Sequence, residues 1–226
     1  MERLDKLLAA TGQWSRKEAK ALVKAGRVQV GGARPKGPED KVAEGTPVTV
    51  DGRPIATEQG VYVMLHKPAG VVSSTQDPRE RTVLDLLPQH LRRRALFPVG
   101  RLDKDTEGLL LLTNDGPLAH ALLAPGRHVD KVYYVEVDGR LDQQDRRAFQ
   151  AGVTLADGTV CQPADLTVLE TLREGKYHQV KRMLAARGKP VTYLKRLSMG
   201  PLTLDPALPA GAWRPLTPEE KASLGR

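Results

Sequence analysis

GRLDKDTEGLLLLTNDG, residues 100–116, joins a group of acidic side chains to an unbroken run of four leucines. Three carboxylates precede the leucines of residues 109–112 and one follows them: Asp103, Asp105, Glu107 and Asp115. A short, wholly apolar run with polar flanks is typical of a strand that is buried on both faces of a sheet. The stretch therefore predicts an inner strand, with Asp103 at the edge of the hydrophobic core.

Strand and helix patterns alternate on both sides of this stretch, from residue 61 onwards. Strands are predicted at residues 61–65, 131–139, 166–172 and 191–200. Helices are predicted at residues 81–91, 116–124, 142–152 and 177–188. This order predicts an α+β domain built on a mixed, largely antiparallel sheet flanked by helices.

The first thirty residues follow a different pattern, helix–helix–strand. Residues 3–11 place leucines on one helical face, and Ser15 with Glu18 matches the capping box that opens a second helix. Gly26 is expected to end that helix near residue 25, and a strand follows at residues 27–32. These elements predict a small α/β module, which "VDGRPIAT" links to the rest of the chain.

Basic residues recur along the second helix at spacings of four, four and three: Arg16, Lys20, Lys24 and Arg27. A 3.6-residue period gathers them into one stripe, which has no acidic residue at the i+4 positions. The net charge of +8 and the isoelectric point near 9.7 favour a polyanionic partner. A run of charged residues often marks only a solvent-exposed helix face. Here all the charges are positive and lie on one side of the helix, which favours a surface that binds RNA phosphates.

The composition argues against several classes of protein. The single cysteine, Cys161, excludes an internal disulfide framework and fits a reducing compartment. No C-x-x-C, H-E-x-x-H, P-loop or G-x-G-x-x-G spacing is present, so neither a metal nor a nucleotide cofactor is predicted. The N-terminus has no apolar targeting segment, and no apolar run reaches membrane-spanning length. We expect a cytoplasmic monomer without membrane association.

The tetrapeptide GRLD occurs twice, and the two copies have different contexts. Asp142, in the second copy, precedes a helix pattern and is explained as its N-cap, with Asp145 in the first turn. Asp103 precedes a strand, so capping does not explain it. A calcium loop does not explain it either, because the twelfth position would be Asn114 instead of the required Glu. Asp103 is therefore the candidate functional carboxylate.

The stretch at residues 100–116 resembles the catalytic motif of the RsuA-type pseudouridine synthases. "KPAG" upstream, and "KVYYV" and "EGKYHQVKRM" downstream, resemble the other motifs of that family in the same order. "RLDKLLAATGQWSRKEAKALVKAGRVQVGG" resembles an S4 RNA-binding module. Together the resemblances cover nearly the whole chain. They imply an S4-like domain at residues 1–57 and a pseudouridine synthase catalytic domain at residues 58–226.

The resemblance also implies roles for individual residues. Asp103 matches the catalytic aspartate, which holds the intermediate as a nucleophilic carboxylate. Tyr133 matches the active-site tyrosine, whose ring can receive a base that has left its stack. Lys181 matches the basic partner of the aspartate. Arg101, two residues before Asp103, is a further candidate for binding phosphate or holding the flipped nucleotide; its alternative is a surface ion pair. Near the C-terminal motif, Arg182 and His178 are candidate RNA contacts.

These residues predict an enzyme that isomerises uridine to pseudouridine in ribosomal RNA without a cofactor. "GKYHQVKRM" resembles the branch that acts on small-subunit (16S) rRNA, so the expected partner is small-subunit rRNA in an assembling particle. Two alternatives stay open at this point. The substrate could be large-subunit (23S) rRNA, or the chain could be a non-catalytic S4-type RNA-binding assembly factor.

Overall fold

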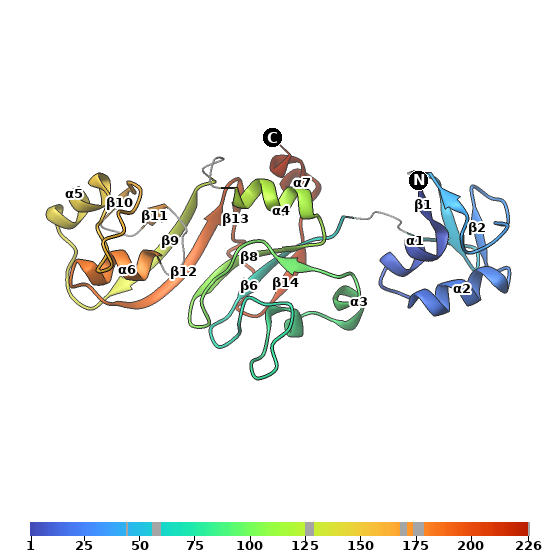
Figure 1. The fold of residues 1–226 in the computed structure, drawn as a ribbon, viewed down its shortest axis with the longest axis horizontal. Helices are drawn as coiled ribbons and strands as arrows, with labels where there is room; N and C mark the ends of the chain where they lie inside the picture. Colours follow the sequence, from blue (N-terminus) through green and yellow to red (C-terminus); the bar gives the residue numbers. More distant parts are fainter. Residues whose placement is uncertain (44, 56–59, 125–128, 168–170, 174–178, 226) are drawn as a thin grey trace. The chain divides into compact units, whose positions relative to one another are not determined.

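A computed structural model describes residues 1–226 apart from 44, 56–59, 125–128, 168–170, 174–178 and 226 (Figure 1). The chain forms two compact units. The first comprises Met1–Val61 with Leu87–Leu96, and the second comprises Tyr62–Leu86 and Phe97–Arg226. The predicted boundary between residues 57 and 58 lies outside the described residues, so it stays a prediction.

Residues 2–55 of the first unit pack two helices against short strands. The elements of the unit are β1 (Glu2–Arg3), α1 (Leu4–Ala10), α2 (Arg16–Lys24), β2 (Val28–Val30), β3 (Lys41–Val42), β4 (Val48–Val50), β5 (Arg53–Ile55) and the short α3 (Gln89–Arg92). Strands β2, β4 and β5 form an antiparallel sheet, and β1 pairs with β3. The predicted capping box is confirmed: the Ser15 hydroxyl accepts from the Glu18 amide and the Glu18 carboxylate accepts from the Ser15 amide. Leucines from α1 and valines from the strands form the core.

The second unit is built on one large sheet. The strands run in the order β10–β11–β9–β12–β8–β6–β14, and β13 and β7 pair with β12 and β8. Their bounds are β6 (Tyr62–Lys67), β7 (Phe97–Pro98), β8 (Glu107–Thr113), β9 (Lys131–Val137), β10 (Leu166–Thr167), β11 (Thr171–Arg173), β12 (Val191–Met199), β13 (Leu202–Thr203) and β14 (Trp213–Pro215). Only the β8–β12 pair among them is parallel, which confirms the predicted mixed, largely antiparallel sheet.

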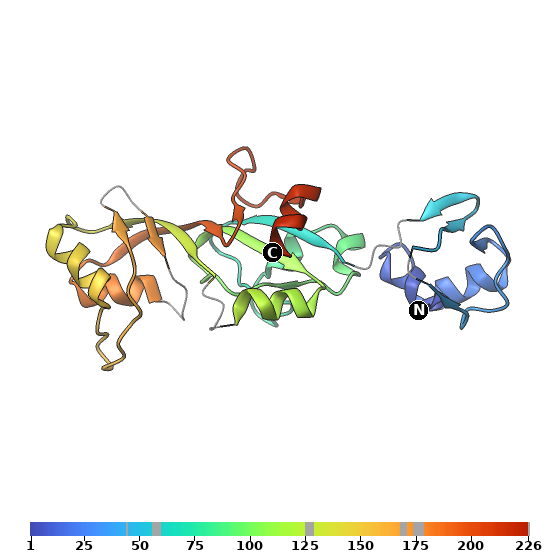
Figure 2. The same ribbon diagram turned by 90° about the horizontal axis from the view of Figure 1, so that it is seen from above.

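The leucine run forms the inner strand that the sequence predicts. β8 lies between β6 and β12, and Gly108–Thr113 are buried along its length. Figures 1 and 2 show β9 and β12 as the long strands that connect this part of the sheet to the end that carries α5, α6, β10 and β11. The helices of the unit are α4 (Gly116–Leu123), α5 (Gln143–Ala151), α6 (Gln179–Ala186) and α7 (Pro218–Leu224).

Three predicted segments differ from the structure. The described part of the expected link, residues 50–55, instead contains the end of β4 and all of β5, which pair in the sheet of the first unit. The strand predicted at residues 166–172 is instead an antiparallel pair, β10 and β11, in which Leu166 lies opposite Leu172 and Thr167 opposite Thr171. The helix predicted at residues 81–91 is divided into a 3-10 helix, Val83–Leu86, and α3, Gln89–Arg92. Pro88 lies between them in extended conformation as the N-cap of α3, because proline fixes φ and removes a backbone donor.

Candidate active site

One row of paired residues crosses four strands of the sheet. Tyr133 on β9 lies opposite Arg196 on β12, Arg196 opposite Gly108 on β8, and Gly108 opposite Lys67 on β6. Directly opposed residues share a face, and neighbouring strands are about 4.8 Å apart. The row therefore places the candidate tyrosine two strands, roughly 10 Å, from the start of β8, where the Asp103 loop enters the sheet.

Gly108 lets the two parallel strands approach at this row. A Cβ atom on Gly108 would lie 2.2 Å from the Arg196 carbonyl oxygen and 2.5 Å from its amide nitrogen. Its φ of +108° is also a conformation that side chains disfavour. Arg196 itself is 2% exposed, and its Nε donates to the Leu109 carbonyl at 2.8 Å. The glycine is thus a steric requirement of the β8–β12 pairing.

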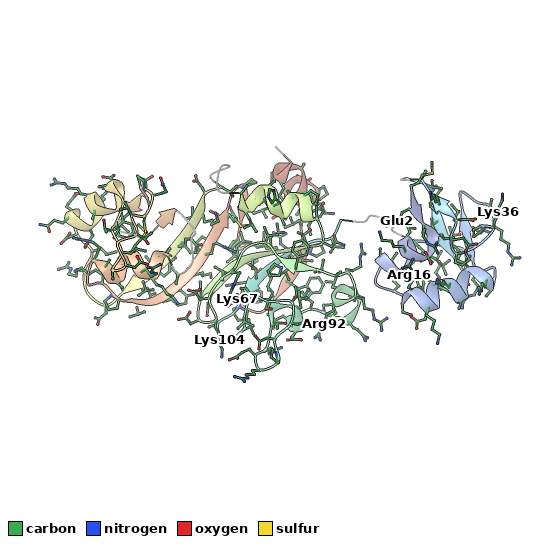
Figure 3. All side chains as sticks on the ribbon, viewed as in Figure 1. Glu2, Arg16, Lys36, Lys67, Arg92 and Lys104 are labelled. Carbon is green, nitrogen blue, oxygen red and sulfur yellow. The ribbon has the colours of Figure 1, made fainter. Side chains whose placement is uncertain are left out.

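Lys67 holds the loop that carries Asp103. Its ammonium group is fully buried and donates to the carbonyl oxygens of Pro68, Lys104 and Thr106, at 3.0, 3.2 and 2.7 Å. Figure 3 shows Lys67 and Lys104 in this part of the second unit. Burial lowers the pKa of Lys67 to about 8, although nearby carboxylates act to raise it. The lysine therefore ties the end of β6 to the residues directly after Asp103.

The structure brings Lys181 and Asp103 together. Lys181, on α6, places its Nζ 3.5 Å from Oδ2 of Asp103 and 2.5 Å from Oδ1 of Asp105. The side chains of Lys181 and Asp103 are 24% and 22% exposed, whereas that of Asp105 is 73% exposed. A partly buried carboxylate thus has a cationic partner from a helix 78 positions further along the chain. This ion pair offsets the cost of withdrawing the carboxylate from water.

The remaining predicted residues differ in their surroundings. Tyr133 is buried, at 5% exposure, and Arg101 is exposed. Arg182 pairs with Asp157, with 2.5 Å between Nη2 and Oδ2, so it has an acidic neighbour that the sequence reasoning did not include. His178 lies outside the described residues.

Asp142 behaves as the sequence predicts for the second GRLD. Its carboxylate accepts from the amides of Gln144 and Asp145 at the N-terminus of α5. Asp145 in turn accepts from the Asp142 amide, which completes a capping box. The capping interpretation of this copy is confirmed.

Two residues of the basic stripe share a carboxylate from another helix. Asp5, on α1, lies 3.4 Å from the Arg16 Nε and 3.9 Å from the Lys20 Nζ. Arg3, directly before α1, contacts the same carboxylate at 3.0 Å. The stripe therefore lacks acidic partners on its own helix but has one from α1.

The other end of the stripe also departs from the prediction. α2 ends at Lys24, and Arg27 follows the helix, after Gly26 with φ of +71°. Arg27 forms an exposed pair with Asp51, with 2.8 Å between Nε and Oδ1. Lys24 is exposed. The four basic residues are thus distributed over α2 and the turn after it.

Sequence reasoning missed three residues that the structure makes prominent: Lys67, Arg196 and Asp5. Lys67 had a signal, because it opens the "KPAG" motif at the end of a predicted strand. Asp5 and Arg196 had none, since their burial depends on partners distant in the sequence. In the ranges that the structure describes, no group of three or more His, Cys, Asp or Glu side chains could hold a metal ion. None of the helices described is long and apolar enough to span a membrane.

Comparison with known proteins gives independent evidence on the family. The pattern of the family "RNA pseudouridylate synthase" matches residues 61–186, and that of the S4 domain matches residues 2–48. A ribosomal small subunit pseudouridine synthase A of Pseudomonas aeruginosa is 44% identical, over 98% of this chain and 100% of that protein. An uncharacterized RNA pseudouridine synthase of Bacillus subtilis is 48% identical, over 96% of each chain.

A solved structure supports the same assignment. The crystal structure of a pseudouridylate synthase superposes with a TM-score of 0.69 at 33% identity, covering 99% of this chain and 100% of the other. Both the sequence motifs and the fold therefore match over nearly the full length. The chain belongs to the RNA pseudouridylate synthase family and is an RNA pseudouridine synthase, an isomerase, with an S4 domain near its N-terminus.

Proposed function

We propose that the protein converts one uridine of small-subunit (16S) rRNA to pseudouridine, with Asp103 as the catalytic carboxylate. The observation that carries the catalytic part is the ion pair between Asp103 and Lys181, at 3.5 Å, beside the inner strand of the sheet. The substrate part is supported by the relatives named ribosomal small subunit pseudouridine synthase A, which are 40–44% identical.

The reaction is redox-neutral and needs a group that keeps the base and the ribose in place. The N1–C1′ bond of uridine breaks, the base turns, and a C5–C1′ bond forms. The proton on C5 is lost and N1 gains one, so the product is an isomer of the substrate. Asp103 holds the intermediate as a nucleophile, and Lys181 keeps its charge paired while the site is closed to water.

The target base must leave its stack to reach this carboxylate. Tyr133 offers an aromatic ring for the flipped uracil, in the row of paired residues that ends beside the Asp103 loop. Arg101 is exposed two residues before Asp103, where its guanidinium can hold a flanking phosphate. Arg182 and the basic stripe of the first unit add contacts to the RNA backbone.

The substrate is tested by incubating the full-length protein with unmodified small-subunit and large-subunit rRNA. Each RNA is supplied naked and as a partly assembled particle, and pseudouridine is mapped by carbodiimide labelling and primer extension. One new stop in the small-subunit RNA is expected, stronger in the particle. A stop only in large-subunit RNA would overturn the proposed substrate. A monomer is expected by sedimentation, since the proposed site uses residues of one chain.

A further inference from the structure

Asp5 lies at the centre of a cationic cluster in the first unit. Its side chain is fully buried, and its carboxylate contacts three cations at 3.0, 3.4 and 3.9 Å: Arg3, Arg16 and Lys20. The Nε and Nη2 groups of Arg3 donate to the two oxygens as a fork. The cations come from two segments, the β1–α1 start and α2, which the sequence separates by more than ten residues. Figure 3 marks Arg16 on α2.

The cations face solvent although their common anion does not. The side chains of Arg3, Arg16 and Lys20 are 44%, 56% and 48% exposed, against 0% for Asp5. The carboxylate therefore lies beneath the three cations. An approaching polyanion meets the positive groups first, and the cluster keeps a net charge of +2.

The base of this cluster is rigid. The Asp5 amide donates to the Pro38 carbonyl and the preceding amide, of Leu4, donates to the Asp40 carbonyl, each at 2.8 Å. Hydrogen bonds from Arg3 and Arg16 lower the pKa of Asp5 to about 2. The carboxylate is therefore ionised throughout the pH range in which RNA is stable. Three cations brought together without an anion would repel one another and separate.

We propose that Asp5 is a positioning residue that assembles Arg3, Arg16 and Lys20 into one binding site for RNA phosphate groups. The inference rests on the proposed RNA substrate and adds Arg3 and Asp5 to the binding surface. It has an unusual consequence: a buried negative charge increases the affinity of a basic protein for a polyanion, because it fixes the geometry of the cations around it.

The first test neutralises that carboxylate. Asp5→Asn raises the net charge by one, so a surface that acts by charge alone would bind RNA more tightly. We expect binding of a small-subunit rRNA transcript to weaken about fivefold. The slope of log binding constant against log salt concentration, called the salt slope below, should become shallower by about one for each phosphate contact that is lost. Filter binding at several salt concentrations measures both. Equal or tighter binding by a folded Asp5→Asn protein would overturn the proposal.

Asp51→Asn is the matched control. It removes the acidic partner of another arginine of the same unit, Arg27, but this pair is exposed on both sides, at 52% and 47%. Solvent already screens it, so binding should stay equal or become slightly tighter. Equal losses in both variants would mean that burial of the carboxylate is unimportant, which contradicts the proposal.

Two further variants keep the test valid if Asp5→Asn is unstable. Arg3→Gln should weaken RNA binding and make the salt slope shallower by about one. Arg3→Lys keeps the charge, so it should retain most of the affinity and most of the salt slope. With Arg3→Gln, KM for rRNA should rise while kcat is unchanged, a split that a purely structural contact would not produce. An unchanged KM and salt slope would overturn the proposal. Because filter binding needs no turnover, a chain that binds as expected but modifies no uridine would refute only the proposed function.

Discussion

Asp103 and Asp142 are identical side chains in identical GRLD sequences, and the structure gives them opposite surroundings. Asp142 caps α5, whereas Asp103 faces an ammonium group from α6. Asp103→Asn should abolish isomerisation, because it keeps the size of the side chain and removes the nucleophile, and RNA affinity should stay nearly unchanged. Release of tritium from 5-tritiated uridine in rRNA measures the reaction.

The second aspartate provides the control for this prediction. Asn also caps helices well, so Asp142→Asn should retain activity. Wild-type tritium release by Asp103→Asn would remove this residue from the mechanism. If Asp142→Asn were folded but inactive, the catalytic aspartate would be Asp142, in the second GRLD sequence, and not Asp103.

Lys67 should make stability depend on pH in a defined window. Its pKa in the folded protein is about 8, below the ordinary 10.5, because burial disfavours the charged form. Between these values the unfolded chain binds more protons, so the free energy of unfolding rises as pH increases from about 8 to 10.5. The rise is expected to be about 1–3 kcal/mol.

The measurement compares wild type with Lys67→Met, which keeps the length of the side chain but cannot titrate. Urea unfolding at pH 7, 8, 9 and 10 gives the difference in stability between the two proteins. Above pH 8 the free energy of unfolding of the wild type should rise relative to that of Lys67→Met. A difference that stays constant across the series would mean that Lys67 is not protonated differently in the folded and unfolded states.

Residue-scale prediction from sequence depends on whether a side chain has a local reason for its position. Asp103 is a candidate because neither a cap nor a calcium loop explains it, whereas the cap at Ser15 is predictable because capping is local. The roles proposed for Lys181 and Tyr133 come only from the resemblance to a family. Asp5 looked like an ordinary acidic residue in a helix, since nothing in its neighbours shows that it is buried beneath three cations.

At the scale of elements, the β8–β12 pairing depends on one glycine. Gly108→Ala should destabilise the protein by about 3 kcal/mol or more, because the new Cβ would overlap the backbone of Arg196 and φ is positive. Chemical denaturation measures the loss. Gly225→Ala, after α7 with φ of −88° and 3.9 Å between the added Cβ and the Ala222 carbonyl oxygen, should change stability by less than about 0.5 kcal/mol. Similar losses at both positions would contradict the close approach.

Element prediction succeeded where a pattern has one structural solution and failed where it has two. The leucine run allows little besides an inner strand, and the capping boxes fix helix starts. The alternation in "LTVLETL" fits one strand or two paired strands equally well, and only the register with β9 and β11 distinguishes them. Mixed pairing of β12, parallel to β8 and antiparallel to β9, likewise depends on contacts far apart in sequence.

At the scale of the whole molecule, the two residues of the basic stripe outside the Asp5 cluster, Lys24 and Arg27, should contribute to affinity independently of that cluster. Lys24→Gln combined with Arg27→Gln should lower the salt slope of rRNA binding by up to about two and leave kcat at saturating RNA unchanged. Lys6→Gln with Lys36→Gln, the same charge change outside the stripe, should have a smaller effect. If both pairs reduce the slope equally, net charge rather than the stripe determines binding.

The order of strand pairing has a consequence for synthesis on the ribosome. The strands of the first unit find all their partners within residues 2–55, whereas β8 needs β12, which ends at residue 199, and β6 needs β14, which ends at residue 215. Domains fold as their residues emerge, and long-range pairing comes last. A nascent chain therefore completes the strand pairing around the proposed RNA-binding surface before the large sheet brings Lys181 to Asp103, so we expect it to bind RNA before it can modify RNA.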